Sequence, residues 1–199
     1  NRIGLAVIGQ SEGLAPADKK LYALRDVTGT VDSIPLIASS VMSKKLASGA
    51  QAILLDVKVG SGAFMKTIEE ARALAKAMVD IGRENGRSLK AVLTDMDRPL
   101  GHAIGNALEI REVIDTLKGH GPEDLTHECI IMAAHMLVLS HICDYETALT
   151  RVREALDSGA ALERLRLMID AQGGNSSVID NESLLAIGQC TYDVIAPKA

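Results

Sequence analysis

The order of elements between residues 51 and 94 constrains the fold most strongly. Residues 51–59 (QAILLDVKV) form an apolar run of strand length, and a glycine-rich turn, GSG, follows it. Residues 67–85 then carry apolar side chains at helical spacing, with Thr67 as N-cap and Glu70 in the capping-box position. Residues 89–94 (LKAVLT) form the next strand. Strand, helix and strand in this order predict a parallel βαβ unit, in which ligands bind outside the carboxyl ends of the strands.

Helical patterns flank this unit on both sides. Residues 17–30 predict one helix, and a second begins at Asp32 or Ser33, has Pro35 in its first turn and runs to Gly49. Further helices are expected at 107–119, 123–142, 145–157 and 160–171.

Both ends of the chain predict extended structure. Residues 3–9 (IGLAVIG) read as a buried strand, and TYDVIAPKA at the end contains a short strand-like run. The fold class is therefore α/β, a parallel-sheet α/β domain with part of a small all-helical domain. We assign residues 14–50 to the helical part, and 1–13 with 51–199 to the α/β part.

Composition excludes several classes of function. Aromatic residues make up 2% of the 199 residues and the net charge is −5, so the chain lacks the stacking platforms and basic patch of a nucleic-acid binder. No apolar run reaches the roughly 20 residues that a membrane span requires. Three cysteines without a CxxC pair indicate free thiols and a cytoplasmic location.

Polar residues within LRDVTGTVDSIPLIASSVMSKK (24–45) are candidates for a binding site. Ser40 and Lys44 are four residues apart on one predicted helix and share a face, and a helical hairpin brings Arg25 opposite them. Two cationic donors flanking a hydroxyl match the carbonyl, N–H, carbonyl edge of a uracil-type ring. Solvated surface charges and a capping serine are the alternative interpretation.

Two loops carry weaker signals. The turn in DVKVGSGAFMK could cradle a phosphate, but it lacks the Walker pattern, and a tight turn explains it equally well. Phe64 could form the wall of an apolar pocket or fill the core. The loop TDMDRPLGHAIGNALEIRE combines carboxylates and carbonyls, which are ligands for hard cations, although acidic loops are usually only solvated.

Three long motifs resemble one known family. APADKKLYALRDVTGTVDSIPLIASSVMSKKLASG, LLDVKVGSGAFMK and LTDMDRPLGHAIGNALEIREVIDTLKG, together with GPEDL, closely resemble the pyrimidine-nucleoside and thymidine phosphorylases. This resemblance implies phosphorolysis of uridine, thymidine or deoxyuridine to the free base and a (deoxy)ribose 1-phosphate. It implies that Arg25, Ser40 and Lys44 bind the pyrimidine, with Arg25 and Lys44 as catalytic groups and Phe64 beside the ring.

The resemblance also implies cofactors and partners. A potassium ion would be bound by Leu100 and Ala103 through main-chain carbonyls and by Glu112 through its carboxylate. The substrate would be a pyrimidine nucleoside, and phosphate would be the co-substrate. A second copy of the chain would be the partner in a homodimer. No nucleic acid or membrane partner is expected.

Two departures from the family pattern qualify this reading. Gly29 stands where the family usually has alanine, which we expect to loosen the helix end. The KHSTGG-type phosphate segment and most of the C-terminal domain are missing, and the chain opens NRIGLAVIGQ without a Met. We therefore expect an internal fragment that is inactive alone. The alternatives are a non-catalytic nucleobase-binding or structural remnant and a phosphoribosyltransferase relative.

Overall fold

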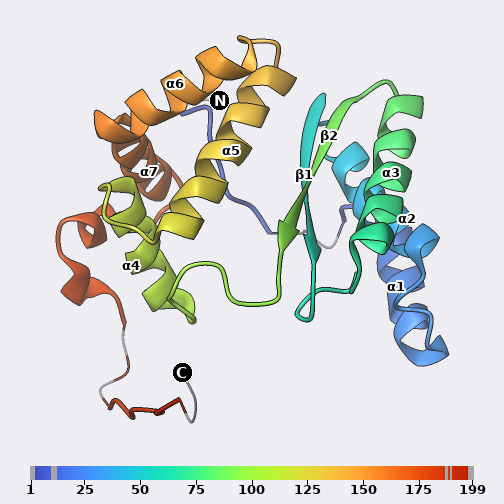
Figure 1. Ribbon diagram of the computed structural model, residues 1–199, viewed down its shortest axis with the longest axis horizontal. Coiled ribbons are helices and arrows are strands. Elements are labelled where there is room, and N and C mark those ends of the chain that lie inside the picture. Colours follow the sequence, from blue (N-terminus) through green and yellow to red (C-terminus); the bar gives the residue numbers. More distant parts are fainter. Residues whose placement is uncertain (1–2, 10–12, 187, 189, 197–199) are drawn as a thin grey trace.

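The computed structural model describes residues 3–9, 13–186, 188 and 190–196. In chain order its elements are α1 (Pro16–Thr28), α2 (Ile34–Ala47), β1 (Ala52–Val59), α3 (Ile68–Glu84), β2 (Ser88–Asp95), α4 (Asn106–Leu117), α5 (Glu123–Leu139), α6 (Tyr145–Asp157), α7 (Ala160–Ala171) and the short 3-10 helices η1 (Ser176–Ile179) and η2 (Glu182–Leu184). The sheet lies between α1, α2 and α3 on one side and α5 on the other, with α4, α6 and α7 beyond α5 (Figure 1). The predicted α/β class is confirmed.

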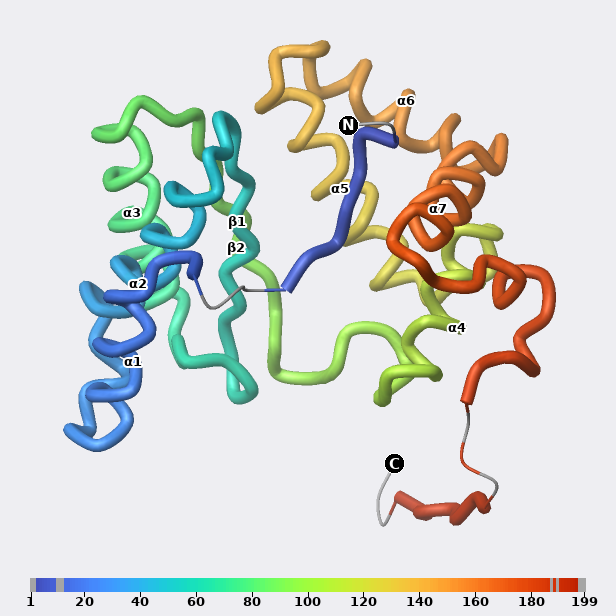
Figure 2. Tube along the Cα trace, turned by 180° about the vertical axis from the view of Figure 1, so that it is seen from behind, coloured from blue at the N-terminus to red at the C-terminus, as the bar shows by residue number. Residues whose placement is uncertain are grey.

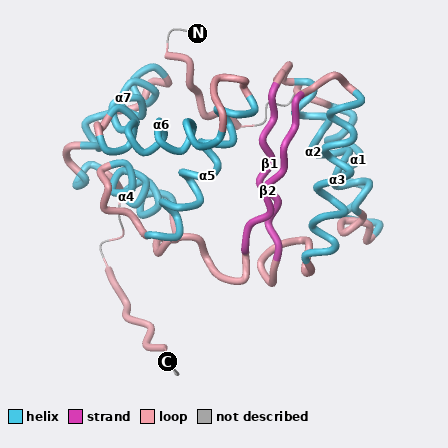
Figure 3. The backbone as a smooth tube through the Cα atoms, turned by 45° about the horizontal axis from the view of Figure 1, so that its top comes forward, coloured by secondary structure: helices cyan, strands magenta, loops and turns pink. Residues whose placement is uncertain are grey.

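The centre of the fold is the βαβ unit. β1 and β2 pair in parallel, with Ala52 opposite Ser88 and Val59 opposite Asp95, so the predicted parallel pairing is confirmed. Both strands end at the same edge of the sheet, where the β1–α3 loop and the loop after β2 begin (Figure 3).

Helix α3 begins with the predicted capping box. The Glu70 N–H donates to Thr67 Oγ1 at 3.3 Å, and the Thr67 N–H donates to Glu70 Oε2 at 3.1 Å. The apolar face of the helix buries Leu74 and Met78 against the sheet. Gly82 allows close contact with β2, because a Cβ atom built there would lie 2.2 Å from a methyl group of Leu89.

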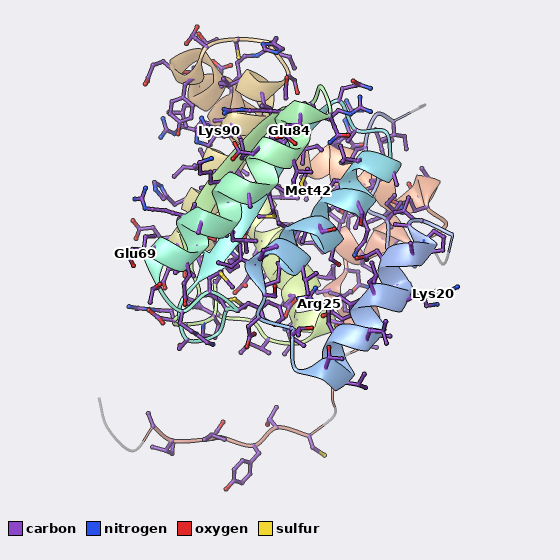
Figure 4. All side chains as sticks on the ribbon, turned by 90° about the vertical axis from the view of Figure 1, so that its right-hand side faces the viewer. Lys20, Arg25, Met42, Glu69, Glu84 and Lys90 are labelled. Carbon is purple, nitrogen blue, oxygen red and sulfur yellow. The ribbon has the colours of Figure 1, made fainter. Side chains whose placement is uncertain are left out.

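Helix α2 connects the N-terminal helix pair to the same core. Ile37, Ala38 and Met42 of α2 are buried in one cluster with Leu55 of β1 and Met78 of α3. Figure 4 views this layer from the side, with α3, α2 and α1 next to one another and Met42 labelled on α2. The proposed domain boundary near residue 50 stays a prediction.

The prediction of a buried strand at residues 3–9 is wrong. The segment is extended but outside the sheet, and Val7 and Ile8 are 68% and 79% exposed. It lies on the side of α5 and α7 (Figure 2). There the side-chain amide of Gln172 accepts from the Val7 N–H at 3.0 Å and donates to the Val7 carbonyl at 2.7 Å. A side chain thus supplies both bonds that a neighbouring strand would make.

The prediction of a strand-like run at the C-terminal end is also wrong for residues 191–196. That segment has no strand, and Val194 and Ile195 are exposed. Residues 197–199 of the predicted tail lie outside the described residues. None of the helices among the residues described combines the length and apolar character needed to cross a bilayer.

Candidate functional site

Arg25, Ser40 and Lys44, which we call the polar row, lie on two antiparallel helices. Arg25 on α1 donates to the carbonyl of Leu36 at the start of α2, at 3.4 Å, while Lys44 near the end of α2 bonds Asp18 near the start of α1. Leu36, Ser40 and Lys44 follow one another at intervals of one helical turn on one face. Lys44 Nζ donates to Ser40 Oγ at 3.0 Å, which confirms the predicted shared face. Ser40 therefore lies between the Arg25 and Lys44 ends of the row.

Asp18 is the candidate residue that sequence reasoning missed. Its side chain is only 9% exposed and forms an ion pair with Lys44. Asp18 and Arg25 are the buried residues of α1, seven positions apart and so on one face. Two opposite charges on the inward face of a helix are the signal that could have identified it.

The electrostatics of the polar row depend on Asp18. Burial alone raises the pKa of the Asp18 carboxyl. The hydrogen bond from Lys44, the neighbouring Ser40 hydroxyl and the positive charges of Lys44 and Arg25 outweigh burial and bring this pKa below its ordinary value. The carboxylate therefore stays ionised and partly neutralises the two cations.

Arg25 stabilises the connection between α1 and α2. Its three nitrogen atoms donate to carbonyl oxygens of Thr30 (3.4 Å), Val31 and Leu36 (3.4 Å). The guanidinium carbon lies 5.2 Å from the ring centroid of Tyr22, within range of a cation–π contact. Since a guanidinium has five N–H groups, three such bonds leave donors for a ligand.

Gly29 ends α1 in the left-handed conformation, with φ 64° and ψ 28°, and its N–H donates to the Arg25 carbonyl. Glycine adopts this conformation without the steric cost that a Cβ atom brings. The residue therefore fits the helix end rather than loosening it, contrary to the expectation from sequence.

The GSG turn after β1 is held by the protein's own groups. The Ser61 N–H donates to Asp97 Oδ1 at 2.7 Å, and the Gly62 N–H donates to the Met96 carbonyl at 2.9 Å. The bond from Ser61 is the main cause that lowers the pKa of Asp97. A Cβ atom at Gly62 would lie 2.7 Å from the Met96 carbonyl. A tight turn therefore explains the glycines. The Asp97 carboxylate accepts from the Ser61 N–H, a group that a phosphate loop would direct to a bound phosphate.

Phe64 is not core filler, because its side chain is 58% exposed. It forms part of the wall of a cleft of about 510 Å³ between α2, β1 and the GSG turn. Ile37 and Val41 of α2 also line this cleft. At 100° per residue, these two side chains lie within an arc of about 100° that also contains Ser40 and Lys44. The apolar cleft and the polar row are therefore adjacent surfaces of one helix.

A second polar cluster lies near the carboxyl ends of the strands. Lys58 on β1 forms ion pairs of 2.8 Å with Asp56 on the same strand and Glu128 on α5. Asp56 also accepts a hydrogen bond from the Thr94 hydroxyl on β2. Burial lowers the pKa of Lys58, but the two carboxylates outweigh burial and raise it. Sequence reasoning missed this cluster, although Asp56 and Lys58 interrupt an apolar strand at a spacing that places both on one face.

Two of the residues expected to bind potassium, Ala103 and Glu112, are in contact. Glu112 Oε1 on α4 accepts from the N–H groups of His102 at 2.8 Å and Ala103 at 3.0 Å. Glu112 Oε2 lies so close to Gly101 that a Cβ atom there would be 2.4 Å away. The carboxylate is thus seated in the loop that contains Leu100 and Ala103. A carboxylate and main-chain carbonyls are the ligand types that a hard cation prefers, but the bonds described for Glu112 are to N–H groups of this loop.

Comparisons with known proteins show the family to which the chain belongs. The profile of the glycosyl transferase family, a/b domain, matches residues 1–162. Pyrimidine-nucleoside phosphorylases of Staphylococcus aureus, from strains bovine RF122 / ET3-1 and USA300, are each 56% identical over 200 residues, which cover 100% of this chain and 46% of each relative. The chain spans about half the length of these curated relatives. Since the family profile covers most of the residues, the chain belongs to the glycosyl transferase family and matches its a/b domain.

Proposed function

We propose that this chain carries the base-binding part of a phosphorylase that acts on pyrimidine nucleosides. The observation that supports it most directly is the polar row, with Ser40 between Arg25 and Lys44 on adjoining helices. The names of the similar Staphylococcus aureus proteins support the reaction class. The apolar cleft beside the row, with Phe64 in its wall, supports binding of a flat ring.

The reaction is the transfer of a pentosyl group from a pyrimidine to phosphate. A phosphate oxygen forms a bond to the anomeric carbon of uridine, thymidine or deoxyuridine, and the bond from this carbon to the ring nitrogen breaks. The electron pair of the broken bond leaves with the base. Arg25 and Lys44 donate to the two ring carbonyls, where the negative charge of the departing base accumulates, and Ser40 accepts from the ring N–H. The proton of the attacking hydrogen phosphate passes to the ring nitrogen of the released base, and a (deoxy)ribose 1-phosphate remains.

Other parts of the proposal concern cation, partner and location. A potassium ion would be held by Glu112 and the carbonyls of Leu100 and Ala103, where it would stabilise the loop after β2. The protein would act in the cytoplasm, where its free thiols persist. It would form a homodimer, which light scattering of the full-length protein tests.

Phosphate-dependent release of uracil from uridine by the full-length protein tests this function. Lys44→Ala is expected to lower kcat/KM by at least about 100-fold, since it removes a donor to the departing base. The matched control is Lys45→Ala, which removes the exposed neighbouring lysine and should leave the rate unchanged. Release of uracil only from uridine 5′-monophosphate, with pyrophosphate and magnesium, would instead indicate a phosphoribosyltransferase. Binding of uracil without turnover would indicate a non-catalytic nucleobase-binding protein.

A further inference from the structure

The turn after β1, residues 60–65, is closed by its own hydrogen bonds. The Gly60 N–H donates to the Met65 carbonyl at 3.0 Å, and the Ala63 N–H donates to the Gly60 carbonyl at 3.0 Å. Ala63 and Met65 are buried, whereas Phe64 between them is exposed and lines the cleft beside the polar row. Because the turn is a closed unit, a group that moves the turn also moves the Phe64 wall of the cleft.

The loop after β2 holds this unit from outside. The Ser61 N–H donates to Asp97 Oδ1 at 2.7 Å, and the Ser61 hydroxyl donates to the Asp97 carbonyl at 3.4 Å. The Gly62 N–H donates to the Met96 carbonyl at 2.9 Å. The contact is close, since a Cβ atom at Gly60 would lie 2.7 Å from Asp97 Oδ1. Of these three bonds, the one to Oδ1 is the shortest and is accepted by a side chain, so a substitution in the loop can remove it.

We propose that Asp97 is a positioning residue, which holds the turn after β1 so that Phe64 forms a fixed wall for the pyrimidine ring. This inference rests on the proposed function, because it concerns the base that the cleft binds. A carboxylate accepts more strongly than a neutral oxygen does, which suits a bond that anchors an exposed turn. A base that meets a preordered wall loses less binding free energy to ordering the protein. Asp97 acts through the turn and need not touch the base.

Asp97→Ala tests this role in uridine phosphorolysis by the full-length protein. KM for uridine is expected to rise about three- to tenfold, the upper value being that expected for loss of the Phe64 ring. The value of kcat should change less than about twofold, since Arg25 and Lys44 keep their places. Asp97→Asn retains an oxygen acceptor and should restore most of the affinity. Asp157→Ala is the control, since it removes an exposed carboxylate at the end of α6 and should leave KM unchanged. A fall in kcat with KM intact in Asp97→Ala would overturn the inference.

Gly62→Ala disturbs the same junction without removing the carboxylate. Its Cβ atom would lie 2.7 Å from the Met96 carbonyl, so the turn must move away from the loop after β2. KM should therefore rise as in Asp97→Ala. Both effects should disappear in a Phe64→Ala background, where no ring is left to position. A rise in KM of full size when Asp97→Ala is added to Phe64→Ala would overturn the inference.

Fluorine NMR of the full-length protein, labelled with fluorophenylalanine, tests the positioning apart from activity. The Phe64 signal is identified by its loss in Phe64→Leu. This signal should shift or broaden in Asp97→Ala and stay unchanged in Asp157→Ala. An unchanged signal in Asp97→Ala would overturn the inference. If the protein fails to cleave uridine, the proposed function is wrong, and a Phe64 signal that depends on Asp97 would still support the positioning role.

Discussion

The ammonium group of Lys58 on β1 lies 2.8 Å from the carboxylate of Glu128 on α5 and connects the sheet to the helix that covers its second face. Both side chains are partly shielded from solvent, and Asp56 contacts the same ammonium group. Since the chain buries few aromatic residues, such polar contacts contribute to holding α5 in place.

Replacement of Glu128 by Gln is expected to lower the free energy of unfolding by about 1–2 kcal/mol, because the partly buried Lys58 loses one of its two carboxylates. Urea denaturation measures the change. Asp80→Asn is the control, since it breaks the exposed Lys76–Asp80 pair on α3 and should cost less than about 0.5 kcal/mol. Equal losses in the two variants would show that Glu128 contributes no more than a surface charge.

Replacement of Gly29 by Ala is expected to destabilise the protein by about 1 kcal/mol, because alanine pays a steric cost at φ 64°. A Cβ atom there meets nothing within 4 Å, so the cost is conformational. Gly29→Asn should lower the stability less than Gly29→Ala does, since asparagine tolerates this conformation. Thermal unfolding of both variants checks the order, and an alanine variant as stable as wild type would contradict the backbone argument.

Much of the fold follows from local sequence signals. The βαβ unit, the capping box of α3 and the helices through α7 were all predictable, because each depends on residues close in sequence. The exposed position of segment 3–9 was not predictable, since an apolar run indicates a strand whether or not a neighbouring strand is available to pair with it. Gln172, which bonds its backbone, is far away in sequence.

The candidate site was predictable only in part. Ser40 and Lys44 share a face because four residues make about one turn. Asp18 and Glu128 were missed because their partners, Lys44 and Lys58, lie on other elements. Periodicity shows which face a residue occupies, but the partner across the interface depends on tertiary packing.

Acid should weaken the contribution of Asp18 to stability. Its pKa is lower in the folded protein than the ordinary value of about 3.9. As the pH falls, the unfolded chain therefore binds the proton before the folded protein does. The stabilisation is present at pH values above the unfolded-state pKa and is lost as the pH falls through the folded-state pKa. The difference in unfolding free energy between wild type and Asp18→Asn should shrink from pH 7 to pH 3. A difference that is constant over this range would show that ionisation of Asp18 contributes nothing.

Phe64→Ala tests the wall of the cleft beside the polar row. The side chain is mostly exposed, so its loss should change the free energy of unfolding by less than about 0.5 kcal/mol. If a pyrimidine ring packs against it, KM for uridine should rise about tenfold, since apolar contact with the ring is lost. Phe64→Leu should restore part of the affinity. An unchanged KM would place the ring elsewhere.

Glu112→Gln tests the proposed cation site without relying on activity. Potassium should raise the Tm of the wild-type full-length protein above that in choline chloride at equal ionic strength, because an ion that binds the folded state stabilises it. The glutamine variant retains an oxygen that can accept from the N–H groups of His102 and Ala103 but loses the negative charge that attracts the ion. Its Tm should therefore be the same in the two salts. Glu109→Gln is the matched control on the same helix, since Glu109 accepts only from the Gly105 N–H among the bonds described for it, and it should keep the potassium effect. A potassium effect of full size in Glu112→Gln would remove this carboxylate from the ligand set.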